Sequence, residues 1–274
     1  MKLEIKTKKA VNKLLIAVII ALVFLIATGI VAVISGYRIY TDGNGNKFIG
    51  KTTDGTVVRG TIYYSGGEKG SIDRTKGTIV FSNGDKYDGE FSGFYRNGAG
   101  TMTYALTGDE YVGNFKSDKF DGEGKYTYGN GDKYEGNFSG GKKDGFGKYT
   151  WADGSYYEGE FSDNKKNGSG KYFGSDGSSY EGSFVDDLKD GKGTFIFSNG
   201  DKYEGDFSSD KRTGNGTYTW ATGESYTGEF YENKMHGKGK YTWSEGRTYE
   251  GFFENGDVVV KDEKDSSNKD DAKE

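Results

Sequence analysis

Few kinds of reactive side chain are available in this sequence, because it contains one histidine and no cysteine. The histidine is His236, and Thr213 stands 23 residues before it, at the equivalent place of a sequence repeat. We therefore interpret His236 as a polar turn residue rather than a metal ligand or a general base. Without cysteine the chain has no thiolate nucleophile, no thiolate metal site and no disulfide. We predict no metal site and no cofactor.

Carboxylates are the remaining candidates, since paired carboxylates at the right separation can hydrolyse glycosidic bonds. They recur at Glu90, Glu135, Glu158, Glu160, Glu181, Glu204 and Glu229. Each sits at a fixed place in the repeat, on the polar side of an alternating pattern, so we interpret them as solvated surface charges. A Gly-x-Gly pair also recurs, but it leads into a strand rather than a helix N-terminus, which argues against a phosphate-binding loop. We predict no catalytic residue and no enzyme activity.

Cations are also repeated, between the two halves of each unit. The row comprises Arg96, Lys119, Lys142, Lys143, Lys165, Lys166, Lys189, Lys211, Arg212 and Lys234. Projecting from one sheet edge, such a row could bind anionic lipid headgroups. Aspartates such as Asp144 and Asp187 are interspersed, so solubility is the simpler interpretation. The residues of the hypothetical anion- or lipid-binding edge are Lys142, Lys143, Lys165, Lys166, Lys211 and Arg212.

The elements that would position these residues follow from an internal repeat, which is the first organisation to look for. A Tyr-x-Gly-x-Phe pattern recurs with one step of 24 residues and then steps of 23. Its members are Tyr87, Gly89, Phe91, Tyr111, Gly113, Phe115, Tyr134, Gly136, Phe138, Tyr157, Gly159, Phe161, Tyr180, Gly182, Phe184, Tyr203, Gly205, Phe207, Tyr226, Gly228, Phe230, Tyr249, Gly251 and Phe253. The added residue of the first step falls near Ala105–Gly108, where it predicts a looser turn.

Alternation within the repeat predicts a β-hairpin with one aromatic and one polar face, because every second residue of a strand shares a face. Gly-x-Gly, an aromatic strand and a two-residue turn such as Asn130-Gly131 or Asp153-Gly154 complete each unit. A lone hairpin is unstable in water. The fold class predicted is therefore an all-β repeat array, in which consecutive antiparallel hairpins form one elongated, twisted sheet. The mid-strand glycines would let rings approach a neighbouring backbone. Gly174 replaces a strand aromatic, so we predict that Phe173 is out of phase and the sheet bent there.

The N-terminal segment has a different character. Residues 14–34, from Leu14 to Ile34, form an uncharged apolar run, and about 20 such residues span a bilayer as a helix. A cleaved signal peptide is the alternative, but its apolar region is usually shorter. Five lysines precede the run, which predicts a cytoplasmic N-terminus with the repeats on the outer side of a cell membrane. One transmembrane helix would thus precede the repeats.

The predicted organisation has five parts. They are a basic cytoplasmic N-terminus at 1–13, a signal-anchor helix at 14–35, degenerate repeats at 36–86, seven full repeats and a partial one at 87–256, and a polar disordered tail at 257–274.

The repeat pattern resembles the MORN (membrane occupation and recognition nexus) family over about residues 42–256. This resemblance implies a non-catalytic scaffold that presents an extended surface to a protein partner, to another copy of itself or to phospholipid. A cell-envelope carbohydrate-binding module with stacked aromatic residues is the alternative function. The net charge of -5 argues against a nucleic-acid partner, which normally requires a basic surplus. The predicted partners are the membrane, through the N-terminal helix, and an unknown protein, a homo-oligomer, an anionic lipid or an envelope glycan.

Overall fold

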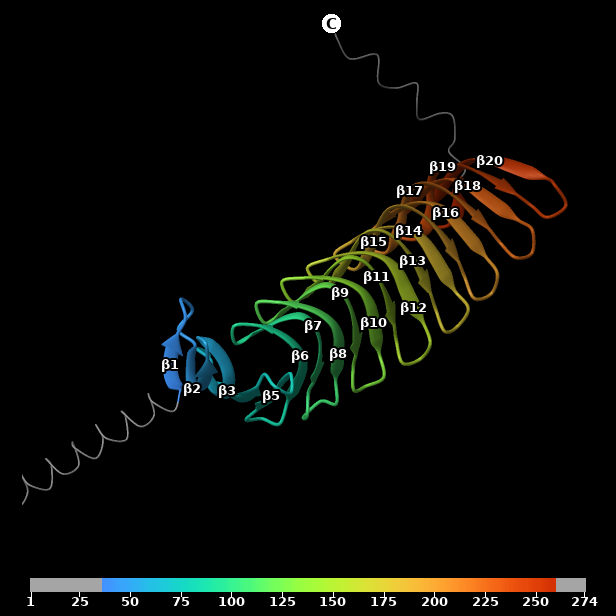
Figure 1. Ribbon diagram of the computed structural model, residues 1–274. Helices are drawn as coiled ribbons and strands as arrows, with labels where there is room; N and C mark the ends of the chain where they lie inside the picture. The colour runs from blue at the N-terminus through green and yellow to red at the C-terminus, as the bar shows by residue number, and fades with distance from the viewer. Residues whose placement is uncertain (1–35, 260–274) are drawn as a thin grey trace, which may run out of the picture. The chain divides into compact units, whose positions relative to one another are not determined.

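The computed structural model describes residues 36–259, which form β-strands (Figure 1). These strands belong to two compact units divided after Asp118. No helix within 36–259 is long and apolar enough to cross a membrane. The predicted span at 14–35 lies outside the described residues, as does the tail from residue 260 onward, so both stay predictions. Residues 257–259, which the sequence pattern assigns to that tail, form a strand instead.

The first unit is a series of antiparallel strands in which each strand pairs with the next. Its strands are β1 (Tyr37–Thr41), β2 (Lys47–Thr53), β3 (Thr56–Tyr63), β4 (Lys69–Asp73), β5 (Thr78–Phe81), β6 (Lys86–Ser92), β7 (Tyr95–Thr103) and β8 (Glu110–Lys116). The degenerate repeats keep the packing scheme with other side chains. Phe48 and Ile62 are fully buried, and Gly50 and Gly60 face each other across β2 and β3.

The second unit continues the same antiparallel scheme with greater regularity. Its strands are β9 (Lys119–Thr127), β10 (Lys133–Ser139), β11 (Lys142–Thr150), β12 (Tyr156–Ser162), β13 (Lys165–Phe173), β14 (Ser179–Val185), β15 (Leu188–Ile196), β16 (Lys202–Ser208), β17 (Lys211–Thr219), β18 (Ser225–Tyr231), β19 (Lys234–Thr242), β20 (Thr248–Glu254) and β21 (Asp257–Val259). Figure 1 shows the hairpins of this unit curving in the same sense one after another. The predicted all-β hairpin array is thus confirmed within each unit.

The core of each repeat is its tyrosine, and Tyr134 is representative, with no exposed surface. Its hydroxyl donates a hydrogen bond to the carbonyl of Asn137 at 2.9 Å. The ring lies over Gly147, where an added Cβ would come within 2.6 Å of ring carbons. Phe138 of the same strand and Phe161 of the next repeat pack edge-on against the ring at 5.0 and 5.1 Å. The glycines therefore permit a close approach of ring to backbone, as predicted.

Consecutive repeats are also joined through the tight turn of each hairpin, whose second residue bonds to the preceding repeat. Asp187 donates its backbone N–H to the carbonyl of Lys166 at 2.9 Å, and its carboxylate accepts the N–H of Lys166 at 2.9 Å. Asn164 and Asn233 make the same pair of bonds to Lys143 and Arg212. Each hairpin is therefore completed by side chains and backbone of the next one.

The tight turns lie at other positions than the sequence pattern predicts. Two-residue turns connect the strands of one hairpin, at positions such as Asp163-Asn164, where φ is 50° and 74°. Positive φ at both central residues matches the twist of a two-residue hairpin. The prediction of such turns at Asn130-Gly131 and Asp153-Gly154 is wrong, because these dipeptides lie within five-residue connections between repeats, such as 151–155. The extra residue near Ala105–Gly108 does lengthen a connection, between Thr103 and Glu110.

Gly174 produces no bend in strand pairing. Strand β13 pairs with β14 from Gly168 opposite Phe184 to Phe173 opposite Ser179, the register found between β11 and β12. The predicted bend is wrong because the backbone of Gly174 makes the bond to Ser178 that Trp151 makes to Ser155. Phe173 does lie on the face opposite the tyrosines, stacked on Tyr156 at 4.7 Å. What Gly174 changes is the side-chain surface.

Candidate functional site

The tyrosine-bearing face of the second unit carries a ladder of half-buried rings, contributed by the second strand of each repeat and the residue that follows it. We call it the ring ladder: Tyr126, Tyr128, Tyr149, Trp151, Tyr172, Phe195, Phe197, Tyr218, Trp220, Tyr241 and Trp243. Successive ring centroids lie 4.4 to 5.8 Å apart up to Tyr172, and again from Phe195 onward. Such contacts stabilise neighbouring rings beyond simple burial. The result is a periodic aromatic surface on one face.

Carboxylates in the connections fix the ring ladder. Asp132 accepts the hydroxyl of Tyr149 at 2.7 Å and the N–H of Ala152 at 2.9 Å. Asp201 holds Tyr218 and Ala221 in the same way, at 2.5 and 2.9 Å. The hydrogen bond from Tyr149 is the main reason that the pKa of Asp132 is lowered. These aspartates are therefore structural braces between one repeat and the next.

Cations form a row beside the rings, and the structure divides the predicted anion-binding edge in two. Lys142, Lys165 and Lys211 are exposed and form ion pairs with Asp163, Asp186 and Glu232 of the following repeat. The other three residues of the predicted edge, Lys143, Lys166 and Arg212, turn onto the aromatic face.

Lys143 lies 4.6 Å from the Tyr149 ring centre, and Arg212 lies 5.0 Å from that of Tyr218. Burial lowers the pKa of Lys143, Lys166 and Arg212. Cations over ring faces gain from the ring quadrupole, so these contacts offset part of the cost of burial. Three cations of the predicted edge thus belong to the ring face, and three are paired with carboxylates.

The ring ladder is interrupted once, at Gly174. An aromatic ring occupies the equivalent position in the adjacent repeats, at Trp151 and Phe197, so the contacts between Tyr172 and Phe195 are missing. A groove with a volume of about 570 Å³ lies next to this interruption, and Tyr172 and Phe195 are among its lining residues. We call it the Gly174 groove, and its lining includes Trp151, Lys166, Tyr172, Tyr180, Lys189 and Phe195. Its size falls within the range of small-ligand sites.

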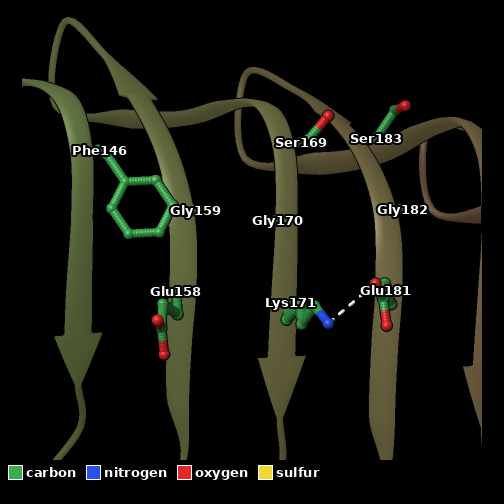
Figure 2. Close-up of a pocket in the computed structure, with 9 residues that line it drawn as sticks. All are labelled: Phe146, Glu158, Gly159, Ser169, Gly170, Lys171, Glu181, Gly182 and Ser183. Atoms are coloured by element: carbon green, nitrogen blue, oxygen red, sulfur yellow. Dashed lines mark ion pairs between the residues drawn. The ribbon is translucent and has the colours of Figure 1, made fainter.

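The opposite face of the same unit presents alternating charges and a smaller depression, about 390 Å³ in volume (Figure 2). Phe146 is 56 % exposed there, near the short side chains of Ser169 and Ser183. Figure 2 shows Lys171 and Glu181 side by side on neighbouring strands, and their ion pair measures 2.9 Å. This face is therefore mainly one of cross-strand charge pairs.

Six of the seven candidate carboxylates lie on that charged face, and Glu90 lies in strand β6 of the first unit. Glu135, Glu158 and Glu181 form ion pairs with Lys125, Lys148 and Lys171 of the strand alongside, while Glu204 pairs with Lys202 of its own strand. Glu90, Glu160 and Glu229 instead accept backbone N–H groups at the irregular part of their hairpins. Each of the seven carboxylates thus has a charge partner or a backbone partner on its own strand or on a neighbouring strand.

His236 lies in strand β19 opposite Glu229, three residues past the tight turn rather than within it. Its ring packs against Tyr231 at 5.6 Å, and within 36–259 its buried Nδ1 has no hydrogen-bond partner. Over the same residues no group of three His, Cys, Asp or Glu side chains is arranged to hold a metal ion.

The sequence pattern marks Gly174 as a departure from the repeat, but it does not reveal the groove that lies next to this position. It also missed Ser155, which occupies the position of Asp132 and Asp201 one repeat before Gly174. Aligning the five-residue connections with one another would have revealed both changes.

Comparison with sequence families agrees with the repeat pattern. The sequence profile of the MORN repeat matches seven segments of the chain: 87–105, 111–133, 134–156, 157–179, 180–202, 203–225 and 226–246. A search of curated protein sequences finds no significant match.

Among solved structures, the TCP domain of SAS-4 (dCPAP) from Drosophila melanogaster, in complex with a proline-rich motif of Ana2 (dSTIL), aligns at 19 % identity and a TM-score of 0.32, covering 61 % of this chain and 86 % of that one. A point mutant of the TCP10 domain of Danio rerio CPAP aligns at 12 % identity and a TM-score of 0.32, covering 79 % of this chain and 99 % of that one. Since the MORN segments make up more than half of the sequence, and since their hairpins recur in the structure with one register, this chain belongs to the MORN-repeat family.

Proposed function

We propose that this chain is a non-catalytic, membrane-anchored scaffold whose ring ladder is a docking surface for a protein partner. The observation that carries the proposal is the ladder itself, a run of half-buried rings confined to one face of the second unit. Aromatic residues are enriched at protein interfaces because they supply large contact areas with little loss of conformational freedom. Large aromatic surfaces that remain accessible in a folded chain mark interaction sites.

The ion pairing of the exposed lysines favours a protein partner over lipid. Lys142, Lys165 and Lys211 are paired with carboxylates of the next repeat, so they contribute little net positive charge at the sheet edge.

The tilt of the rings favours a protein partner over a glycan. Trp151 packs on Tyr149 with an angle of 54° between the planes, so neighbouring rings partly cover the flat faces on which sugars stack.

Site-directed photo-crosslinking in cells tests the docking surface. A photoreactive residue is placed at Trp220, within the ring ladder, and in a separate variant at the exposed Asn215, on the opposite face of the same strand region. We expect a discrete protein adduct from position 220 and none from position 215. Lipid or glycan adducts alone at position 220 would replace the protein proposal with one of these alternatives. A product of twice the monomer mass would identify a second copy as the partner.

Membrane anchoring is a separate part of the proposal and rests on the apolar run from Leu14 to Ile34. Protease added to intact protoplasts should remove the repeats, whereas opened cells are needed to reach the N-terminal lysines. Full protection of the repeats in intact protoplasts would reverse the proposed orientation. Recovery of a mature chain beginning near Ser35 would replace the anchor with a cleaved signal peptide.

A further inference from the structure

The Gly174 groove is the one place where the ring face departs from its repeat, and two substitutions converge on it. At Gly174 a ring is missing from the ladder, between Tyr172 and Phe195. At Ser155, the aspartate that elsewhere accepts a tyrosine hydroxyl is missing. As a result the hydroxyl of Tyr172 has no hydrogen-bond partner within residues 36–259, although those of Tyr149 and Tyr218 have one.

The charges around the groove are unevenly satisfied. Asp210 pairs with Lys189 at 2.8 Å, Asp187 accepts the N–H of Lys166, and Asp153 accepts the hydroxyl of Ser155. The ammonium of Lys166, in contrast, forms no ion pair with a carboxylate of residues 36–259. It lies 5.3 Å from the ring centre of Phe184, where burial lowers its pKa. The carboxylates of Asp187 and Asp210 attract this ammonium without forming an ion pair with it, so a ligand carboxylate would supply its direct partner.

We propose that the Gly174 groove binds one aromatic side chain of the partner protein, with a carboxylate of the partner next to that ring. The ring takes the missing place between Tyr172 and Phe195, and the carboxylate pairs with Lys166 and accepts the Tyr172 hydroxyl. The inference rests on the proposed function, because it assigns one anchor point within the docking surface. Interfaces typically depend on a few such anchors, in which an aromatic side chain fills a pocket.

The chain itself supplies no better occupant. Residues 260–274 contain no aromatic residue, and residues 1–35 contain one, Phe24, inside the predicted membrane span. We therefore assign the ring to a partner molecule. A free ring with a carboxylate is the smallest probe of this chemistry, and N-acetyl-tryptophan provides both groups.

The chain's three tryptophans allow binding to be located. In the full-length protein, labelled with 5-fluorotryptophan, Trp151 lies beside the groove, whereas Trp220 and Trp243 lie further along the ladder. We expect N-acetyl-tryptophan to shift the fluorine signal of Trp151 alone. Its dissociation constant should lie in the millimolar range, because one ring contact and one ion pair supply little binding free energy. N-acetyl-tryptophanamide, which lacks the carboxylate, should bind several-fold more weakly, and N-acetyl-leucine should cause no shift.

A matched variant fills the groove by copying the sequence of the preceding repeat. Gly174→Trp with Ser175→Ala turns residues 174–178 into a copy of 151–155, where a tryptophan coexists with the same Asp–Ser hydrogen bond. We expect this variant to fold and to bind N-acetyl-tryptophan at least about tenfold more weakly, since it removes the ring contacts. Lys166→Met, which copies Met235 at the equivalent position, should abolish the preference for the acid over the amide. Lys171→Met, on the opposite face of β13, should leave that preference unchanged (Figure 2).

Three results would overturn the inference: absence of any shift at Trp151, equal shifts at all three tryptophans, or unchanged binding by the closed variant. Equal shifts would show that the ring face binds aromatic ligands along its whole length, so the proposed docking function would stand without this anchor. Loss of the protein adduct at position 220 is measured separately and would refute the docking surface itself.

Discussion

At the scale of single residues, the repeat tyrosine combines three interactions that the sequence could only suggest. Tyr157 is fully buried, donates its hydroxyl to the carbonyl of Glu160 at 2.9 Å, and lies between Phe161 and Phe184. Tyr249 packs against Phe253 without a following repeat and is only half-buried. The burial of each tyrosine is thus shared between its own hairpin and the next one.

The facing glycines should tolerate no side chain. A Cβ on Gly136 would lie 2.4 Å from the Cα of Gly147 and 2.7 Å from the carbonyl oxygen of Phe146, both of them backbone atoms. Gly136→Ala should therefore lower the free energy of unfolding by about 1–3 kcal/mol, as overpacked core substitutions do. Urea denaturation monitored by circular dichroism measures the change. Gly43→Ala, where an added Cβ meets nothing within 4 Å, is the control. Equal stability of the two variants would contradict the packing scheme.

The buried phenols should make the fold sensitive to alkali. Burial raises the pKa of Tyr180, Tyr203 and Tyr226 to about 12, above the value of about 10 in an unfolded chain. A raised folded-state pKa favours the neutral phenol, so the stabilisation is complete below pH of about 10. It is lost as the pH rises through about 12.

Absorbance at 295 nm, which reports phenolate, provides the measurement for this pH dependence. A set of tyrosines should ionise together with unfolding near pH 12, whereas in urea all phenols should titrate near pH of about 10. Titration of every tyrosine near 10 in the folded protein would refute the burial of the row.

At the scale of elements, the hairpin and the faces of its strands were predictable because two-residue alternation dictates them. The turns were not, because Asn-Gly and Asp-Gly suit several kinds of turn. The tight turns use pairs such as Asp163-Asn164 and Asp186-Asp187, which carry little of the glycine signal expected for positive φ. Their conformation is supported by bonds to the preceding repeat, which are long-range contacts that a local pattern does not contain.

The second residue of a tight turn should be replaceable only by a residue that can cap its neighbour. Asp187→Ala removes the bond to the Lys166 N–H and leaves an alanine at a φ of 75°. We expect a loss of about 1–2 kcal/mol. Asp187→Asn should be nearly neutral, because Asn164 and Asn233 do the same work in other repeats. Hydrogen exchange at the Lys166 amide, together with urea denaturation, distinguishes the two. Equal protection in both variants would count against the cap.

At the scale of the whole molecule, the period of 23 residues makes the repeat the unit of insertion and deletion. Removing residues 203–225 joins Lys202 to Tyr226 and restores the same register, so the protein should fold with modestly lower stability. Removing residues 203–213 cuts a hairpin in half and should leave the following strands without partners. Circular dichroism and thermal melting compare the two deletions. A cooperative melt of the second deletion, equal to that of the first, would show that register is not what holds the repeats together.

The repeat that made the fold predictable also concealed the candidate site. Every position of the motif is occupied for packing, so only a departure from the motif can mark a function. Gly174 and Ser155 are such departures, but their meaning depends on which rings and carboxylates the register brings beside them.

The bonds from each tight turn run to the repeat before it. Each repeat is therefore completed only after the next one has been synthesised. A hairpin leaving the ribosome lacks its caps and its second phenylalanine until the next 23 residues have followed. At roughly 5–20 residues per second, that delay is about 1–5 s, whereas a hairpin closes in about 1–10 μs. Folding therefore keeps pace with translation, and the nascent chain always carries one unfinished unit at its growing end. The newest sheet edge is therefore a place where chaperones or a second nascent chain could bind.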